Sequence, residues 1–229
     1  MDFERRAKQR YEGADGKAYH ETKRSIPDEA YPWVAKLRAK KISPYVQPDD
    51  CVLEYGVGTG WNLAELHCKR KIGFDVSEHL ADVVTAHGIE FIKDIKAVED
   101  SSMDVVICHH ALEHTPVPGD VLKEIDRLLR PGGRLLLFVP FEKEKRYRSY
   151  NPDEPNHHLY SWNAQTLGNL VSEVGFEIEQ AGLGRFGYDR FAAVRAKRLG
   201  LGEPGFGLIR ALVHLIAPMR EVRIIARKT

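Results

Sequence analysis

From residue 51 onward, short apolar runs alternate with segments in which apolar residues recur at helical spacing. Five runs predict buried strands, at residues 51–55, 71–74, 89–92, 103–108 and 134–139. The segments between them predict helices, at residues 61–69, 78–87 and 117–129. Strands that alternate with helices build βαβ units, so the pattern predicts an α/β protein with a parallel sheet.

The pattern changes after residue 175. Strands are expected at residues 176–183 and 221–226, and we expect them to pair as an antiparallel hairpin. Between them, residues 184–218 form an insertion that is far longer than a hairpin needs. Within it, residues 206–216 predict an apolar helix that is too short to span a bilayer. We expect residues 205–218 to cover a ligand pocket or dock on a membrane or protein surface, with packing on the core as the simpler alternative.

Residues 1–48 carry many charged and aromatic side chains, and a helix is expected over residues 32–41. We interpret this region as an N-terminal helical cap on a main domain of residues 49–229. Tyr11, Tyr19, His20 and Trp33 are aromatic candidates for a lid over a ligand. Packing against the flank of the main domain explains them equally well.

A glycine-rich turn follows the first predicted strand, with the sequence Glu-Tyr-Gly-Val-Gly-Thr-Gly at residues 54–60. In α/β proteins such a turn lies at the carboxyl edge of the sheet, where ligands bind. A dinucleotide site needs the spacing G-x-G-x-x-G, whose third glycine lets the helix pack closely on the sheet. Trp61 occupies that position and disfavours NAD or FAD. The spacing G-x-G-x-G, with Glu54 two residues before the first glycine, resembles motif I of class I S-adenosylmethionine-dependent methyltransferases.

Three further segments extend this resemblance in the order that the family shows. Asp75 ends the second strand, Asp94 and Ile95 follow the third, and residues 103–140 resemble the type 11 branch, which includes enzymes of ubiquinone and menaquinone biosynthesis. The resemblance implies a Rossmann-like three-layer α/β sandwich. Its mostly parallel seven-stranded sheet would end in an antiparallel C-terminal hairpin. The resemblance also implies methyl transfer from S-adenosylmethionine, with S-adenosylhomocysteine as the product.

The same resemblance implies which residues hold the cofactor. Asp75 is expected to accept hydrogen bonds from the ribose hydroxyls, and a capping role for the next helix is the alternative. Asp94 and Ile95 are expected beside adenine. Asn62 is expected at the methionine part of the cofactor, or as a cap of the helix after the glycines. The full expected set is Glu54, Tyr55, Gly56, Gly58, Gly60, Asn62, Asp75, Val76, Asp94, Ile95 and His109.

The segment after the fourth predicted strand, His-His-Ala-Leu-Glu-His at residues 109–114, points to the methyl acceptor. Methylation of amino groups on bases would suggest an Asn/Asp-Pro-Pro-aromatic motif here, so an oxygen or carbon of a small molecule is favoured instead. A neutral imidazole suits proton removal near neutral pH. We therefore expect His110 as the catalytic residue and His109 as its competitor, with cofactor contacts alone as the alternative. His110 and His114 lack a nearby third ligand in the sequence, so no metal is expected.

The loop at residues 141–161 is expected to lie over the same edge of the sheet and to form a wall of the acceptor site. Its basic and aromatic side chains would attract an anionic acceptor, although a solvated charged surface explains them as well. The expected acceptor contacts are His114, Tyr147, Arg148, His157 and His158.

Composition narrows the class of partner. The 229 residues carry a formal net charge of +1, and 43% of them are hydrophobic, as in ordinary globular proteins. The near-neutral charge argues against nucleic acid as the main partner. The first residues contain no apolar segment, so a cytoplasmic location is expected. Two other functions stay open, a methyltransferase-like binding or scaffold protein without turnover and a nicotinamide-dependent reductase, against which Trp61 counts.

Overall fold

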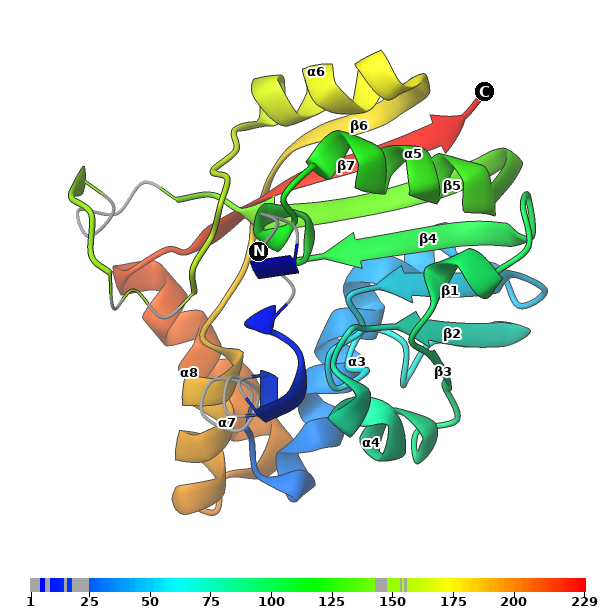
Figure 1. The fold of residues 1–229 in the computed structure, drawn as a ribbon. Helices are drawn as coiled ribbons and strands as arrows, with labels where there is room; N and C mark the ends of the chain where they lie inside the picture. Colours follow the sequence, from blue (N-terminus) through cyan, green and yellow to red (C-terminus); the bar gives the residue numbers. More distant parts are fainter. Residues whose placement is uncertain are drawn as a thin grey trace.

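The computed structural model describes residues 5–6, 9–14, 16–17, 25–142, 148–152, 154 and 156–229. These residues form a seven-stranded sheet with the order β3-β2-β1-β4-β5-β7-β6 (Figure 1). The strands are β1 (Cys51–Tyr55), β2 (Arg70–Phe74), β3 (Glu90–Ile92), β4 (Met103–His109), β5 (Leu129–Pro140), β6 (Phe176–Arg185) and β7 (Arg220–Lys228). Strands β1 to β5 pair in parallel, whereas β7 pairs antiparallel with both β5 and β6. The predicted α/β fold with an antiparallel C-terminal hairpin is confirmed.

Helices cover both faces of the sheet. One face packs against α5 (Pro118–Leu128) and α6 (Ala164–Val174), and the other against α3 (Tyr31–Ile42) and α4 (Ala81–Thr85) (Figure 1). Successive side chains of a strand point to opposite faces, and β4 shows this pattern. Its Val106 and Cys108 join the α5 and α6 side, while Val105 and Ile107 join the other. Short 3-10 helices lie at Asp28–Ala30, Ser43–Tyr45, Glu78–Leu80, Ile95–Ala97 and Leu112–His114.

The insertion between β6 and β7 contains two helices, α7 (Asp189–Arg198) and α8 (Gly202–Ile216), which lie side by side at one end of the molecule (Figure 1). Small residues of α7 and Phe206 of α8 pack with Val34 of α3 in a separate apolar cluster. The outer face of α8 instead exposes Leu208, Leu212 and Leu215. None of the helices in the described ranges has the length and apolar character to cross a membrane.

The helix predicted at residues 61–69 is wrong. Residues 61–65 form turns, in which the amides of Leu63 and Ala64 both donate to the Gly60 carbonyl and the helical ladder stops. The chain must then reach the start of β2, where the Lys69 amide donates to the Asp50 carbonyl at 3.0 Å.

Candidate active site

A cavity of about 480 Å³ opens at the carboxyl ends of β1, β2 and β4. Its walls come from the glycine turn, from the residues after β2 and β4, and from Tyr11 of the N-terminal segment. Nine of the expected cofactor residues line it, namely Glu54, Tyr55, Gly56, Gly58, Asn62, Asp75, Val76, Ile95 and His109. The sheet topology therefore brings most of the expected set to one place, because parallel strands end at the same edge.

The glycine turn is sharp because its glycines adopt conformations that other residues avoid. Gly56 has a φ of +77°, and a Cβ built on it would lie 2.6 Å from the Cβ of Ala111. Gly60, which does not line the cavity, has a φ of +82°, and its Cβ would lie 2.9 Å from a methyl carbon of Ile89. Gly56 therefore keeps the turn close to the end of β4, whereas Gly60 lets the turn pack on the core.

Asp75 is fixed beside the glycine turn by two backbone donors. Its Oδ2 accepts a hydrogen bond from the Gly58 amide and its Oδ1 accepts one from the Ser77 amide, each at 2.9 Å. Burial raises the pKa of this carboxyl, and the two hydrogen bonds oppose that shift. The capping alternative for Asp75 is wrong, because Ser77 is the N-cap residue of the helix Glu78–Leu80 and no side-chain hydrogen bond caps that helix. The position of Asp75 on the cavity wall agrees with the ribose role.

Four buried polar atoms on the cavity wall have no hydrogen-bond partner within the described part of the chain. Two are donors, Nε of Arg38 and Nε1 of Trp61, and two are acceptors, Oε2 of Glu54 and Oδ1 of Asn62. An amino-acid zwitterion supplies what these atoms lack, since its carboxylate accepts and its ammonium donates hydrogen bonds. The methionine end of S-adenosylmethionine is such a zwitterion, so the residues present fit the cofactor that the resemblance implies.

Glu54 is the acid of this group, and its side chain is almost fully buried. Desolvation raises the pKa of its carboxyl to about 8, and the hydrogen bond from Asn62 opposes this shift. The Nδ2 atom of Asn62 donates to Oε1 of Glu54 at 2.5 Å. The capping alternative for Asn62 is wrong, because no helix begins there.

The expected adenine residues separate in the structure. Ile95 lines the cavity, as does Val76 after β2. Asp94 is exposed outside the lining, and its Oδ1 accepts a hydrogen bond from the Lys96 amide at 2.9 Å, at the start of the helix Ile95–Ala97. The contact of Asp94 with adenine stays a prediction.

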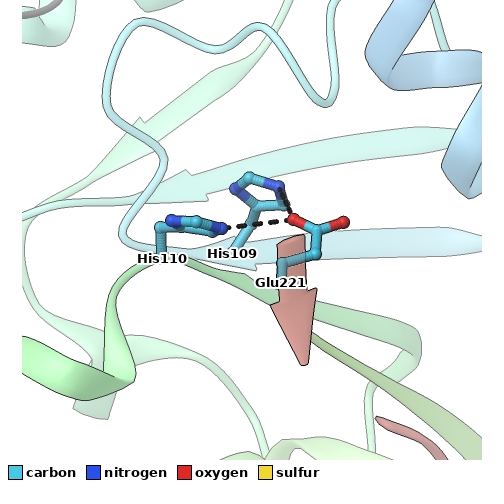
Figure 2. Close-up of side chains that lie close together, drawn as sticks. All are labelled: His109, His110 and Glu221. Atoms are coloured by element: carbon cyan, nitrogen blue, oxygen red, sulfur yellow. Dashed lines mark hydrogen bonds and ion pairs between the residues drawn. The ribbon is translucent and has the colours of Figure 1, made fainter. Parts of the chain in front are cut away.

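His109 and His110 lie buried at the end of β4, and Figure 2 shows both rings beside the carboxylate of Glu221 from β7. Nε2 of His109 lies 2.8 Å from both Nη1 of Arg38 and Nζ of Lys41. Since arginine and lysine only donate, this nitrogen is an acceptor and the ring is neutral. Burial lowers the pKa of His109 well below its usual range. Nε2 of His110 lies 3.2 Å from Oε2 of Glu221, and burial lowers the pKa of His110 to about 4.

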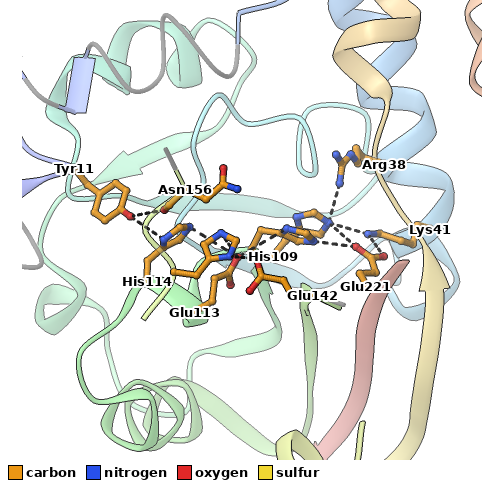
Figure 3. Close-up of polar contacts among 11 residues, drawn as sticks. Tyr11, Arg38, Lys41, His109, Glu113, His114, Glu142, Asn156 and Glu221 are labelled. Carbon is orange, nitrogen blue, oxygen red and sulfur yellow. Dashed lines mark hydrogen bonds and ion pairs between the residues drawn. The ribbon is translucent and has the colours of Figure 1, made fainter. Parts of the chain in front are cut away.

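A second group of side chains surrounds Glu113, whose carboxylate is buried. Oε1 of Glu113 lies 3.8 Å from Nε2 of His114 and 3.9 Å from Nε2 of His158. Figure 3 shows Tyr11, Glu142 and Asn156 around this group. The hydroxyl of Tyr11 lies 2.7 Å from Nδ1 of His114.

The other expected acceptor contacts do not join this group. Arg148 is exposed. His157 is partly buried, and its amide donates to the Glu154 carboxylate at 2.7 Å. Tyr147 lies outside the described residues. The anionic character of the acceptor therefore stays a prediction.

Sequence reasoning missed four residues of the site, Arg38, Glu113, Glu142 and Glu221. The chain places them far from the glycine turn, so no spacing in the motifs includes Arg38 or Glu221. Glu113 had a visible signal, since it stands between His110 and His114 in an otherwise apolar stretch. Glu221 had a weaker one, as an acid at the start of an apolar strand.

A mostly parallel sheet with this strand order and an antiparallel β7, a glycine turn after β1 and a buried carboxylate after β2 are the features of a class I S-adenosylmethionine-dependent methyltransferase. A family model described as "Methyltransferase domain" matches residues 28–181. The match covers more than half of the chain, so the chain belongs to this methyltransferase family.

Individual relatives and solved structures agree with this assignment. The ubiquinone biosynthesis O-methyltransferase of Xanthomonas oryzae pv. oryzae (strain PXO99A) is 32% identical over an alignment of 99 positions that covers 38% of this chain and 41% of that protein. The chain therefore matches about two fifths of the length of this curated relative. The phosphoethanolamine N-methyltransferase 2 of Haemonchus contortus, solved with S-adenosyl-L-methionine, has a TM-score of 0.59 at 16% identity and covers 87% of this chain and 56% of that one. The [4+2]-cyclase SpnF has a TM-score of 0.60 at 21% identity over 85% of this chain and 80% of that one, which shows a shared fold alone.

Proposed function

We propose that the protein transfers the methyl group of S-adenosylmethionine to a hydroxyl oxygen of a small-molecule acceptor. The observation that carries the proposal is His110, a buried neutral imidazole on the cavity wall after β4, where the family resemblance places the methyl group. The related proteins named ubiquinone biosynthesis O-methyltransferases support oxygen as the acceptor atom. A carbon acceptor is the alternative.

The residues of the cavity orient the reactants. Glu54 and Asn62 would accept hydrogen bonds from the cofactor ammonium, and Arg38 and Trp61 would donate to its carboxylate. Asp75 would hold the ribose. When bound, S-adenosylmethionine supplies an electrophilic methyl group on a sulfonium. With one end of the cofactor fixed in this way, most of the catalysis is alignment of the acceptor in line with the carbon–sulfur bond.

His110 is the proton acceptor in this proposal. Its Nε2 donates to Glu221, which Lys41 keeps ionised through an ion pair of 2.8 Å, so the lone pair of the neutral ring is on Nδ1. The bound cofactor would supply its methyl group to the acceptor oxygen, with the electron pair of the broken carbon–sulfur bond left on sulfur. Nδ1 of His110 would take the hydroxyl proton.

A turnover screen tests the proposal. Wild-type protein is incubated with S-adenosylmethionine and sets of phenols, quinone precursors, sugars and carboxylic acids, and formation of S-adenosylhomocysteine is measured. With an accepted phenol, His110→Asn should lower kcat by roughly a hundred to ten thousand-fold and leave the KM for the cofactor almost unchanged. Asparagine is chosen because His110 has a φ of +54°, a conformation that asparagine tolerates better than alanine.

His67→Asn is the matched control, because His67 is an exposed histidine away from the cavity. Full turnover in His110→Asn would remove this residue from the reaction. Binding of S-adenosylmethionine without product from any acceptor would favour the binding or scaffold function instead.

A further inference from the structure

The group around Glu113 has the arrangement of a metal site. Glu113, His114 and His158 each offer one ligand atom, and these three atoms lie within 4.8 Å of one another. The carboxylate of Glu113 is 1% exposed, and the two imidazoles are 12% and 13% exposed. Glu113 and His114 belong to the helix Leu112–His114 after β4, whereas His158 comes from the loop after β5. The fold thus joins ligands that the sequence keeps apart.

The separations between the ligand atoms are those of long ion pairs, and they are close to the spacing of two ligands around one metal ion. Oε1 of Glu113 lies 3.8 Å from Nε2 of His114 and 3.9 Å from Nε2 of His158, which is beyond hydrogen-bond length. Two ligands on one tetrahedral zinc ion, with bonds of about 2.0–2.1 Å, lie about 3.4 Å apart. The two separations from Glu113 exceed this spacing by about 0.4–0.5 Å, and the ligand nitrogens of the two imidazoles lie within 4.8 Å of each other.

The second ring nitrogen, Nδ1, of each of the two imidazoles already has a partner. Nδ1 of His158 lies 2.5 Å from Oε1 of Glu142, so this nitrogen carries the proton and Nε2 has the lone pair. Nδ1 of His114 lies 2.7 Å from the Tyr11 hydroxyl (Figure 3). Metal-binding histidines usually have such a partner on the second nitrogen, because it fixes the ring and its tautomer.

We propose that Glu113, His114 and His158 bind one divalent transition-metal ion of the zinc type. Two imidazoles and one carboxylate are a donor set of catalytic zinc sites, where a fourth position stays open for water or substrate. His114 and the following Thr115 line the cofactor cavity, so the open position would be next to the methyl acceptor. His110 lies beside the site as well, with its Nδ1 3.9 Å from Oε1 of Glu113.

The role of the ion rests on the proposed function. A hydroxyl oxygen bound to the metal loses its proton more readily, so the ion would activate the acceptor while His110 takes the proton. The sequence argument against a metal considered only His110 and His114. The fold supplies the carboxylate and the third ligand from a distant loop.

Metal binding is tested without acceptor or cofactor, so that its outcome does not depend on turnover. Wild-type protein is treated with a chelator, dialysed and titrated with Zn²⁺, and with Co²⁺ as a spectroscopic probe. The expected result is one ion per chain, with the visible absorption of a tetrahedral Co²⁺ complex. His158→Asn should weaken Zn²⁺ binding by more than a hundredfold, and Glu142→Gln by about ten to a hundredfold.

His157→Asn is the matched control, since the neighbouring histidine is not part of the group. It should bind Zn²⁺ like the wild type, and the affinity of all variants for S-adenosylhomocysteine should show that they are folded. Absence of Zn²⁺ and Co²⁺ binding at micromolar concentration in the wild type, or equal binding in His158→Asn, would overturn the site. If the ion binds but chelation leaves turnover unchanged, the role in the reaction is overturned.

Discussion

Glu54 should release a proton when the cofactor binds. Burial raises the pKa of its carboxyl to about 8. At pH 7 about nine tenths of the molecules would then carry this proton. The cofactor ammonium beside the carboxylate would lower the pKa by about 1–3 units, and the new hydrogen bond would lower it further. Once the pKa is near 6 or below, binding at pH 7 releases about 0.8–0.9 of a proton per chain.

Calorimetry in two buffers measures this release. S-adenosylhomocysteine is titrated into the protein at pH 7 in phosphate and in Tris, whose ionisation enthalpies differ, and the difference in binding enthalpy gives the number of protons. Glu54→Gln is the control, because glutamine keeps the shape and the hydrogen bond from Asn62 but carries no titrating proton. The variant should release no proton from this position and should bind about 10 to 150-fold more weakly, since a charge-assisted hydrogen bond is worth roughly 1.5–3 kcal/mol. Equal proton release in the two proteins would refute the assignment of Glu54 to the ammonium.

The same pKa gives a prediction for stability without cofactor. The folded pKa lies above the ordinary value of 4.5, so the stabilisation that protonated Glu54 gives is complete below pH 4.5 and is lost as the pH rises towards 8. The free energy of unfolding of the wild type should therefore fall relative to that of Glu54→Gln across this pH window, by at most about 5 kcal/mol. Urea unfolding at pH 5 and pH 8 measures the difference. A difference that does not grow with pH would contradict the buried, protonated state.

Three other changes test the cavity and the surface. Asp75→Ala should weaken the binding of S-adenosylhomocysteine by roughly 1.5–3 kcal/mol in a folded protein, and an unchanged affinity measured by calorimetry would remove the ribose role. Gly56→Ala should destabilise the fold by about 1–3 kcal/mol in urea unfolding, because of its positive φ and the close approach of the chain after β4; wild-type stability would show that the turn can relax. Replacing the exposed residues Leu208, Leu212 and Leu215 of α8 by glutamine should leave Tm and cofactor affinity nearly unchanged, and a folding defect would show that they pack on the core.

The strands and the glycine turn were predictable because their signals are local. Leu53 and Val106 stand in short apolar runs, and the close spacing of Gly56 and Gly58 constrains the backbone of a single turn. The helix at residues 61–69 was wrongly predicted for the opposite reason. Its residues have acceptable helix propensity, but the amides of Leu63 and Ala64 both donate to the Gly60 carbonyl, and the Lys69 amide donates to Asp50 instead of continuing a helix.

The charged parts of the site were less predictable, because they depend on tertiary contacts. Arg38 pairs with Asp189 of α7 at 2.5 Å, across 151 positions of the chain. Glu221 reaches the end of β4 because β7 pairs with β5, and Val139 and Pro140 lie opposite Val222 and Glu221 in that register. Nothing in the local sequence around these residues indicates which partner they meet.

His109 and His110 were left as alternatives by the sequence, and the structure places both at the end of β4. Neighbouring residues of a strand point to opposite faces, so only one of the two histidines was expected to face the acceptor. The positive φ of His110 ends the strand, and the two rings instead lie stacked with their centroids 4.5 Å apart, both beside Glu221. The difference between them is electrostatic. Arg38 and Lys41 both donate to His109, so a proton added to His109 would lie next to two cations. His110 instead lies between two carboxylates, that of Glu221 on one side and that of Glu113 on the other. We therefore expect His110 to be the better proton acceptor, and His109 to position the Arg38 guanidinium, to which it is hydrogen-bonded.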